Sequence, residues 1–233
     1  VIAFTLTFMG LTPAGEVIDA ARTPLHVAPE DAGADAIISI LVVGDSLTDA
    51  THYPRELYEL MQGPGNPELQ MIGSHAGSGR EPTGQVAHEG YGGWCWSFFC
   101  TRWTDDESYR AKSKFLRMID GQPTLDFQHY LDMYNDGQAP DVITVLLGCN
   151  DTFSATEETI EERIDDMFKH YDMLIDMIHA VRKDTRIGCL LLPPPAATQD
   201  AFGANYRSGQ TRWQYRRNQV RVVERMTAHY GNR

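Results

Sequence analysis

Long hydrophobic runs are absent from this 233-residue chain, and none approaches the ~20 apolar residues that a membrane span requires. Positive charge is scarce as well, because 20 Lys and Arg face 32 Asp and Glu, for a formal net charge of −12. This acidic balance argues against nucleic acid and against membrane surfaces as partners. The sequence also has no internal repeat and no low-complexity segment. A hydrophobic content of 42% is that of an ordinary globular protein.

Cysteine is sparse too, and the four residues have no spacing typical of a metal site: Cys95, Cys100, Cys149 and Cys189. Cys95 and Cys100 could meet in a helical turn, and the sequence leaves their pairing open. A metal-dependent hydrolase built from the scattered His and Asp residues is disfavoured, since no ligand pair has metal spacing on one element. We therefore expect neither a metal nor another cofactor.

The first 28 residues read as short strands joined by turns. The expected strands are residues 1–9, 16–23 and 25–28, and the first of them alternates apolar and small side chains with period two. So short a segment cannot bury a core of its own, so we interpret it as the last strands of a preceding β module. Residues 29–36 are polar and punctuated by Pro and Gly, which predicts a linker.

Residues 37–233 alternate buried-strand runs with helical patterns. The expected strands are residues 37–43, 69–73, 141–147 and 186–192, and the expected helices are 53–61, 94–103, 129–134, 156–183 and 210–229. Such alternation predicts an α/β fold, a three-layer α/β/α sandwich with a parallel sheet. Residues 104–124 have no clean periodicity and form either a lid or binding loop or a plain surface excursion.

Polar residues follow two of these strands. Ser46 lies just after the apolar run that ends at Gly44, in the string Gly44-Asp45-Ser46-Leu47, and Gly148-Cys149-Asn150-Asp151 follows the strand at 141–147. The cluster Gly90-Tyr91-Gly92-Gly93 lies between them in sequence. Open α/β sheets bind ligands at the carboxyl ends of their strands. The three strings, in this order, resemble blocks I, II and III of the SGNH (GDSL) hydrolase superfamily.

This resemblance implies a serine esterase that needs no metal. Ser46 would be the nucleophile, and the backbone N–H of Gly93 and the side-chain amide of Asn150 would donate to the oxyanion, with Gly92 in reserve for Gly93. Asp45 and Trp94 are candidates for contact with substrate. Asp45 and Asp151 are otherwise interpreted as hydrogen-bond acceptors that fix their turns.

The family's base comes from an Asp-x-x-His block near the end of the domain, and the chain to Arg233 has no such block in that place. Two internal strings match its pattern, Asp126 to His129 and Asp176 to His179. The first precedes block III and the second lies within a predicted helix, so neither is expected to be catalytic. We expect the domain to be incomplete at its C-terminus, with the Asp and His beyond residue 233 and these 233 residues inactive by themselves.

Several alternatives stay open for the function. The chain could be a non-catalytic binding relative that keeps the pocket, or a lipase/acylhydrolase of the same superfamily. The α/β-hydrolase fold is excluded, because Ser46 is not within a Gly-x-Ser-x-Gly string. The aromatic residues near block II and the acidic composition favour a carbohydrate esterase acting on a small ester or an acetylated glycan, secreted or periplasmic. The sequence does not give the oligomeric state.

Overall fold

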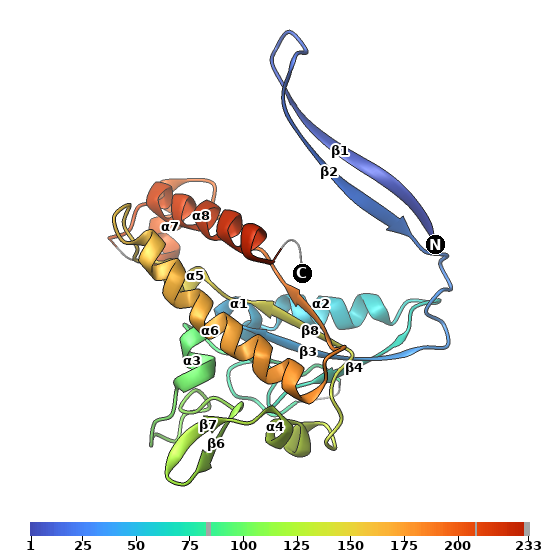
Figure 1. Ribbon diagram of the computed structural model, residues 1–233, viewed down its shortest axis with the longest axis vertical. Helices are drawn as coiled ribbons and strands as arrows, with labels where there is room; N and C mark the ends of the chain where they lie inside the picture. Colours follow the sequence, from blue (N-terminus) through green and yellow to red (C-terminus); the bar gives the residue numbers. More distant parts are fainter. Residues whose placement is uncertain (83–84, 208, 231–233) are drawn as a thin grey trace.

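The centre of the protein is a parallel sheet in the order β4–β3–β8–β9 (Figure 1). The computed structural model describes residues 1–82, 85–207 and 209–230. The strands are β3 (Ile37–Gly44), β4 (Glu68–Ile72), β8 (Val142–Leu146) and β9 (Arg186–Cys189). A two-residue strand, β5 (Glu89–Gly90), continues the β4 edge by pairing with the end of β3. No helix in the described ranges is long and apolar enough to cross a membrane.

Both faces of the central strand β3 are buried, as a parallel sheet requires. Ile40 and Val42 pack on the face covered by helix α2 (His52–Met61). Leu41 and Val43 belong to the larger core on the opposite face, which includes helix α6 (Ile160–Val181). The helices thus sandwich the sheet, which confirms the predicted three-layer α/β/α architecture with its parallel sheet.

Most of the predicted elements are present with small shifts of their ends. Helix α6 buries its apolar stripe at Ile160, Ile164, Met167, Phe168, Tyr171, Leu174 and Ile178, and its first residue follows Thr159. Helices α3 (Trp96–Thr101), α4 (Phe127–Tyr134) and α8 (Arg212–Tyr230) occupy three further predicted helical segments. Strand β9 ends at Cys189, three residues before the predicted end at residue 192.

Two segments differ from the predicted pattern. The stretch 104–124, expected as one loop, contains strand β6 (Leu116–Ile119), which pairs with β7 (Gln122–Leu125) across a tight turn at Asp120 and Gly121, both at positive φ. The polar loop expected after β9 contains helix α7 (Gln199–Tyr206), capped by the Thr198 hydroxyl, which accepts from the Ala201 N–H. The two hairpin strands have four residues each and α7 has eight, so these elements are too short to produce a clear periodic signal.

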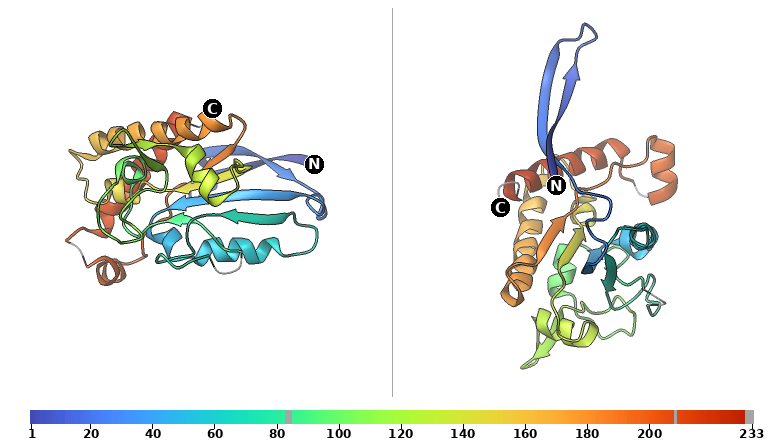
Figure 2. Two further views of the ribbon diagram at one scale, coloured as in Figure 1. Left: turned by 90° about the horizontal axis from the view of Figure 1, so that it is seen from below. Right: turned by 90° about the vertical axis from the view of Figure 1, so that its right-hand side faces the viewer.

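The N-terminal segment is a long antiparallel hairpin of β1 (Ile2–Leu11) and β2 (Val17–Val27) that projects away from the α/β body (Figures 1 and 2). Strand β2 is continuous, whereas two short strands were predicted, because Pro24 lies on an edge strand where its missing N–H breaks no ladder. Every residue of the hairpin strands is exposed. We propose that the segment belongs to a separate module, with residues 29–36 as the boundary.

Opposite residues of the hairpin share a face, and the two faces differ. Ile2 pairs with Val27 and Phe4 with Leu25, so one face is apolar. The other face carries pairs such as Thr7 with Arg22. Phe4 is 55% exposed and Phe8 61% exposed, although both lie on the apolar face. The hairpin is therefore an amphipathic ribbon whose apolar side is exposed.

Candidate active site

The three polar strings converge because the ends of three parallel strands are in register. Gly44 of β3 is paired with Gly90 of β5 on one side and with Leu146 of β8 on the other. The residues that follow these strands therefore leave the sheet at the same level and on the same edge. This is the edge where open α/β sheets bind ligands.

Ser46 is the first residue of the short helix α1 (Ser46–Asp49), directly after β3. The helix is capped by the Asp45 carboxylate, which accepts from the Leu47 N–H at 3.0 Å. A side chain at Gly44 would lie 1.9 Å from the Thr48 hydroxyl oxygen, so only glycine lets the helix turn back this closely over the strand. The tight turn leaves Ser46 exposed to solvent.

The glycine cluster follows β5 and is fastened to the serine turn. The Tyr91 N–H donates to the Gly44 carbonyl at 3.0 Å, and the Trp94 N–H donates to the Tyr91 carbonyl. Gly93 has φ +80° and is exposed, and no atom lies within 4 Å of the position a Cβ would take there. An open, left-handed glycine is a position where a ligand can approach backbone closely.

A buried carboxylate at the end of β5 forms hydrogen bonds that hold the start of this turn. Glu89 is 1% exposed and accepts hydrogen bonds from the Tyr130 hydroxyl at 2.9 Å, from the Tyr91 hydroxyl and from the Ser74 hydroxyl. The Ser74 N–H also donates to it. Because a buried charge is tolerated only when its hydrogen bonds are satisfied, these donors fix the strand end that leads into the glycines.

Asn150 joins all three strings through its side-chain amide. It lies on helix α5 (Cys149–Thr152), directly after β8, and its Nδ2 donates to the Trp94 carbonyl at 2.8 Å and to Asp45 Oδ2 at 3.3 Å. The shorter contact reaches the residue after Gly93, and the longer one reaches the residue before Ser46. The turns that carry Ser46, Gly93 and Asn150 are therefore linked by hydrogen bonds through their neighbouring residues.

Asp45 and Trp94 are nearly inaccessible, at 1% and 2% exposed. Both oxygens of Asp45 are engaged, one by the Leu47 N–H and the other by Asn150. Burial argues against the expectation that the Asp45 side chain binds substrate, and its hydrogen bonds assign it to holding the turns together. Trp94 lines the hollow beside the glycine turn, so its contact with substrate stays a prediction. Burial also raises the pKa of the Asp45 carboxyl, mainly because desolvation disfavours its charged form.

Asp151 carries the other acceptor role expected in block III. Its Oδ1 accepts from the Trp96 N–H at 3.1 Å, which ties α5 to the start of α3, and its Oδ2 has no hydrogen-bond partner in the described chain. Burial raises the pKa of the Asp151 carboxyl to about 7. When this carboxyl ionises near neutral pH, its buried charge destabilises the folded state.

The raised pKa of Asp151 makes the stability of the protein depend on pH. Between about pH 4 and pH 7 the folded state keeps a proton that the unfolded state has lost, so the free energy of unfolding falls as pH rises. The Asp151→Asn substitution keeps an acceptor for the Trp96 N–H and removes this dependence of the free energy of unfolding on pH. We expect urea denaturation to show the variant more stable by roughly 3–4 kcal/mol at pH 8 and no more stable at pH 4.

Asp105 is an exposed carboxylate, so Asp105→Asn makes the same substitution at the surface and supplies the matched control. Equal slopes of stability against pH in the Asp151→Asn variant and the parent protein would contradict the assignment.

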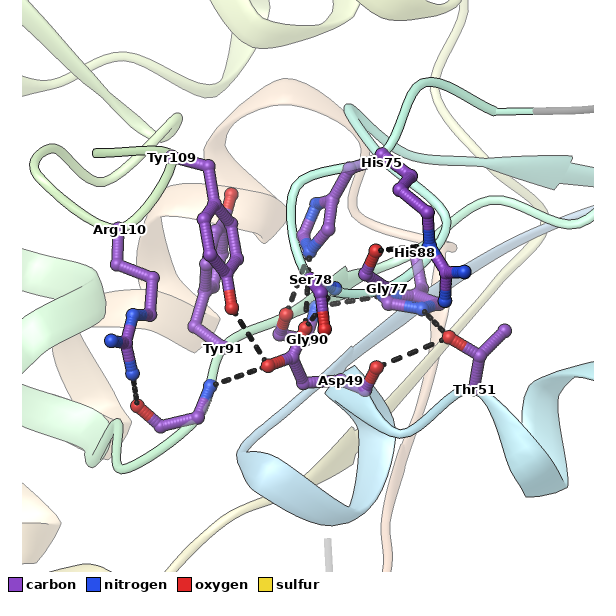
Figure 3. Close-up of polar contacts among 12 residues, drawn as sticks. Asp49, Thr51, His75, Gly77, Ser78, His88, Gly90, Tyr91, Tyr109 and Arg110 are labelled. Carbon is purple, nitrogen blue, oxygen red and sulfur yellow. Dashed lines mark hydrogen bonds and ion pairs between the residues drawn. The ribbon is translucent and has the colours of Figure 1, made fainter. Parts of the chain in front are cut away.

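A second polar network holds the far end of the serine helix (Figure 3). Thr51 has a left-handed φ of 64°, which is rare for a β-branched residue, and its hydroxyl donates to the Asp49 carbonyl at 3.1 Å. His88 contacts that hydroxyl through Nε2 at 3.0 Å, while its Nδ1 accepts from the Gly90 N–H. The Nε2 therefore carries the proton. Burial and the neighbouring His75 lower the pKa of His88 to about 4, so it is neutral at physiological pH.

A hollow of about 280 Å³ opens beside the glycine turn. It is lined by Gly92, Gly93, Trp94, Phe98, Arg102, Asp106, Ser108 and Arg110. The Arg102 guanidinium lies 4.8 Å from the centre of the Phe98 ring, and its Nε donates to the Arg110 carbonyl. The space next to the expected oxyanion donor is thus bordered by two cationic side chains from the segment after α3.

No histidine hydrogen-bonds to Ser46 or Asn150 within the described ranges. Asp126 caps helix α4 by accepting from the His129 N–H, which accounts for the first Asp-x-x-His string. His179 lies beside β9 on α6 and contacts the Thr185 carbonyl at 3.3 Å. The described residues also contain no cluster of three His, Cys, Asp or Glu side chains that could bind a metal.

The four cysteine thiols are free in this structure. Cys149 lies on α5 beside Asp45, and burial raises the pKa of its thiol to about 12, so it is protonated near neutral pH and unsuited to act as the nucleophile. Ser46 therefore remains the candidate at this edge.

Several residues of this site escaped sequence reasoning. Asp49, at the end of the serine helix, contacts the glycine turn, and so does Arg110, while His75 and His88 contact Asp49 and Thr51. None of the four was predicted as a site residue. For Asp49 a signal existed, because it ends the apolar-to-polar stretch that contains Ser46. For Arg110 there was none, since it lies in the segment without periodicity.

The parallel α/β/α fold and a serine, a glycine turn and an asparagine at adjoining strand ends define the class of the SGNH ester hydrolases. Residues 40–232 match the model of the family described as GDSL-like lipase/acylhydrolase, and the chain belongs to this family of carboxylic ester hydrolases. In a comparison with curated proteins, nothing matches the chain.

Solved structures of esterases are similar to it. A family 3 carbohydrate esterase of Clostridium thermocellum is 20% identical, with 83% of this chain and 74% of that chain covered and a TM-score of 0.45. A lipase/acylhydrolase from Enterococcus faecalis is 14% identical over 83% of this chain and 73% of that chain, with a TM-score of 0.37. The acetyl xylan esterase AlAXEase is 13% identical over 82% and 73%, with a TM-score of 0.39.

Proposed function

We propose that this protein is a serine esterase that hydrolyses small carboxylic esters through an acyl-enzyme on Ser46, and that it removes acetyl groups from a carbohydrate. The observation that carries the proposal is the convergence at the carboxyl edge of the sheet. Ser46 follows β3, Gly93 follows β5 and Asn150 follows β8, and hydrogen bonds of 2.8–3.3 Å link the three turns. Membership in a family of ester hydrolases supports the same chemistry.

In the proposed reaction the Ser46 hydroxyl oxygen attacks the ester carbonyl carbon while a histidine takes its proton. The tetrahedral intermediate then expels the alcohol, which receives that proton, and leaves an acetyl group on Ser46. Water attacks this acyl-enzyme by the same route and releases acetate. The N–H groups of Ser46 and Gly93 and the amide of Asn150 donate to the oxygen that becomes negative.

Asn150 needs one rearrangement to act in this way. Its Nδ2 has two hydrogens, and both point at protein acceptors, Trp94 at 2.8 Å and Asp45 at 3.3 Å. The contact with Asp45 is long for a hydrogen bond to nitrogen and hence the weaker one. We infer that a small rotation of the whole carboxamide, which moves both hydrogens together, gives up the weaker contact with Asp45 and directs that hydrogen to the oxyanion.

The base in this proposal is a histidine, and within the described ranges no histidine hydrogen-bonds to Ser46. The proposal is supported by the positions of the internal histidines, because His88 is fully buried and its Nε2 hydrogen-bonds Thr51, while His179 lies against the Thr185 carbonyl. We infer accordingly that residues 1–233 alone hydrolyse esters only slowly, through the donors and binding that remain.

The test is hydrolysis of 4-nitrophenyl esters of increasing chain length and of acetylated xylan by the complete protein. We expect kcat/KM to be highest for acetate and to fall at least about tenfold by the octanoate, because the hollow near Gly93 is small and bordered by charge. Acetate release from acetylated xylan, measured by an enzyme-coupled assay, would support the carbohydrate substrate. Chelator is included as a control, and activity that it abolishes would contradict a metal-free mechanism.

Two results would replace the proposal with another one. Preference for long acyl chains would assign the protein to the lipases of the family. Binding of acetylated glycans without hydrolysis by the complete protein would indicate a non-catalytic relative.

A further inference from the structure

One residue of the glycine turn is held by a charged group at each end. The Gly92 N–H donates to Asp49 Oδ2 at 3.2 Å, and the Gly92 carbonyl accepts from Arg110 Nη1 at 2.9 Å (Figure 3). A Cβ built on Gly92 would lie 3.2 Å from Arg110 Nη1 and 3.3 Å from Asp49 Oδ2. The Asp49 carboxylate and the Arg110 guanidinium thus bind the N–H and the carbonyl of the same residue.

The Gly92 carbonyl and the Gly93 N–H belong to the same peptide unit. That unit is planar and trans, since the described chain has no cis peptide bond, so its C=O and N–H point in opposite directions. The Arg110 guanidinium on the oxygen therefore fixes the direction of the Gly93 N–H, which points away from Arg110. Gly93 has no side chain and nothing crowds its Cβ position, so the orientation of this peptide depends on the hydrogen bond at Gly92 O together with the turn bond from the Trp94 N–H to the Tyr91 carbonyl.

We propose that Arg110 is a positioning residue of the esterase, which orients and polarises the Gly92–Gly93 peptide so that the Gly93 N–H serves as an oxyanion donor. The proposal rests on the proposed function, because it needs an oxyanion at this place. A charged donor on an amide oxygen draws electron density from the nitrogen and makes the N–H of the same amide a stronger donor. Arg110 therefore acts on the reaction through the backbone and not by touching substrate.

Arg110 is itself held in place, which a positioning role requires. Its backbone N–H donates to the Ser108 hydroxyl at 3.2 Å, and its carbonyl accepts from Arg102 Nε at 2.9 Å. Its guanidinium lies 5.6 Å from the centre of the Tyr109 ring. Within the described chain no carboxylate forms an ion pair with it, so its charge is directed at the Gly92 carbonyl.

The other end of Gly92 is equally well determined. Asp49 is the last residue of α1, and its two oxygens accept from the Ser78 N–H at 2.7 Å, from the Tyr109 hydroxyl at 2.8 Å and from Gly92. Tyr109 precedes Arg110, so the same short segment supplies a donor to Asp49 and a donor to the Gly92 carbonyl. The serine helix and the oxyanion turn are thereby locked at a fixed separation by residues 109 and 110.

The test compares Arg110→Met and Arg110→Lys in the complete protein, with 4-nitrophenyl acetate as substrate. Methionine keeps the apolar stem without a donor, so kcat should fall roughly tenfold while KM stays within about twofold. Lysine keeps a charged donor for Gly92 O and should restore most of kcat. Because Arg110 is exposed, the thermal midpoint of both variants should match that of the parent protein.

Arg117→Met is the control, since this exposed arginine contacts Asp126 and is not among the residues that line the hollow beside the glycine turn. The rate at which a fluorophosphonate modifies Ser46 should fall in the Arg110→Met variant by a factor like that of kcat, because that reaction also places charge on an oxygen. A rise in KM at constant kcat would show that Arg110 contacts substrate and would overturn the proposal. An unchanged kcat would overturn it as well.

Failure of the esterase proposal gives a different pattern. If the Ser46→Ala variant stays active, the function assigned to Ser46 is wrong whatever Arg110 does. If Ser46→Ala is inactive and Arg110→Met is as fast as the parent protein, only the role of Arg110 is wrong.

Discussion

Replacing Ser46→Ala is expected to lower the hydrolysis of 4-nitrophenyl acetate by the complete protein by about 10⁴-fold or more. Loss of the nucleophile removes the acyl-enzyme route and leaves only the donors and substrate binding, whose residual effect is small by comparison. The variant should also resist a fluorophosphonate that modifies the parent protein. Mass spectrometry of the peptide that contains Ser46 measures the adduct, and steady-state kinetics measure the rate.

Ser154 provides the matched control, because it is another exposed serine, close to block III in sequence. The Ser154→Ala variant should keep the activity and the adduct of the parent protein. An adduct on any serine other than Ser46, or turnover by the Ser46→Ala variant, would end the assignment of the nucleophile.

The second large effect is expected at Asn150. The Asn150→Ala variant removes the amide donor from the oxyanion and should lower kcat about 10²–10³-fold with little change in KM. The Asn150→Asp variant should lose more, because it places a third carboxyl next to Asp45 and Asp151, whose pKa values burial already raises. Kinetics on 4-nitrophenyl acetate measure both losses.

Asn150 also links two turns, so the loss of kcat has to be separated from a loss of fold. Asn66→Ala is the comparison, since Asn66 likewise donates its Nδ2 to a backbone carbonyl, that of Leu60 at 3.0 Å, at the end of α2. It should change the thermal midpoint slightly and leave kcat alone. If both variants lose activity only in proportion to their folded fraction, Asn150 is a structural residue and not an oxyanion donor.

The framework of the sheet follows closely from the hydrophobic pattern. Strand β3 is a continuous β-branched run that both layers of helices bury, and α6 carries an apolar stripe over 22 residues. Such signals are strong because burial itself creates them. That Ser46 and Asn150 lie at one edge of the sheet follows from the same pattern, since the carboxyl ends of parallel strands share an edge. Strand β5, which leads to Gly93, has only two residues and gives no hydrophobic signal.

The contacts between the strings could not be predicted in this way. Arg110 reaches the Gly92 carbonyl across a long separation in sequence, from a loop whose path depends on packing and not on periodicity. The burial of Asp45 and Trp94 has the same origin, because a residue at the end of a strand is accessible or hidden according to which loops cover it. Local patterns carry no information about such coverage.

The N-terminal hairpin and the α/β body differ in their stability against local unfolding. A free-standing pair of strands has marginal stability in water, whereas the sheet below it is buried on both faces. The hairpin can therefore fray and re-form many times while the catalytic edge stays assembled, and amide exchange would be fast in the one and slow in the other. Its exposed apolar face, which includes Phe4 and Phe8, is a surface of the kind that promotes association between molecules.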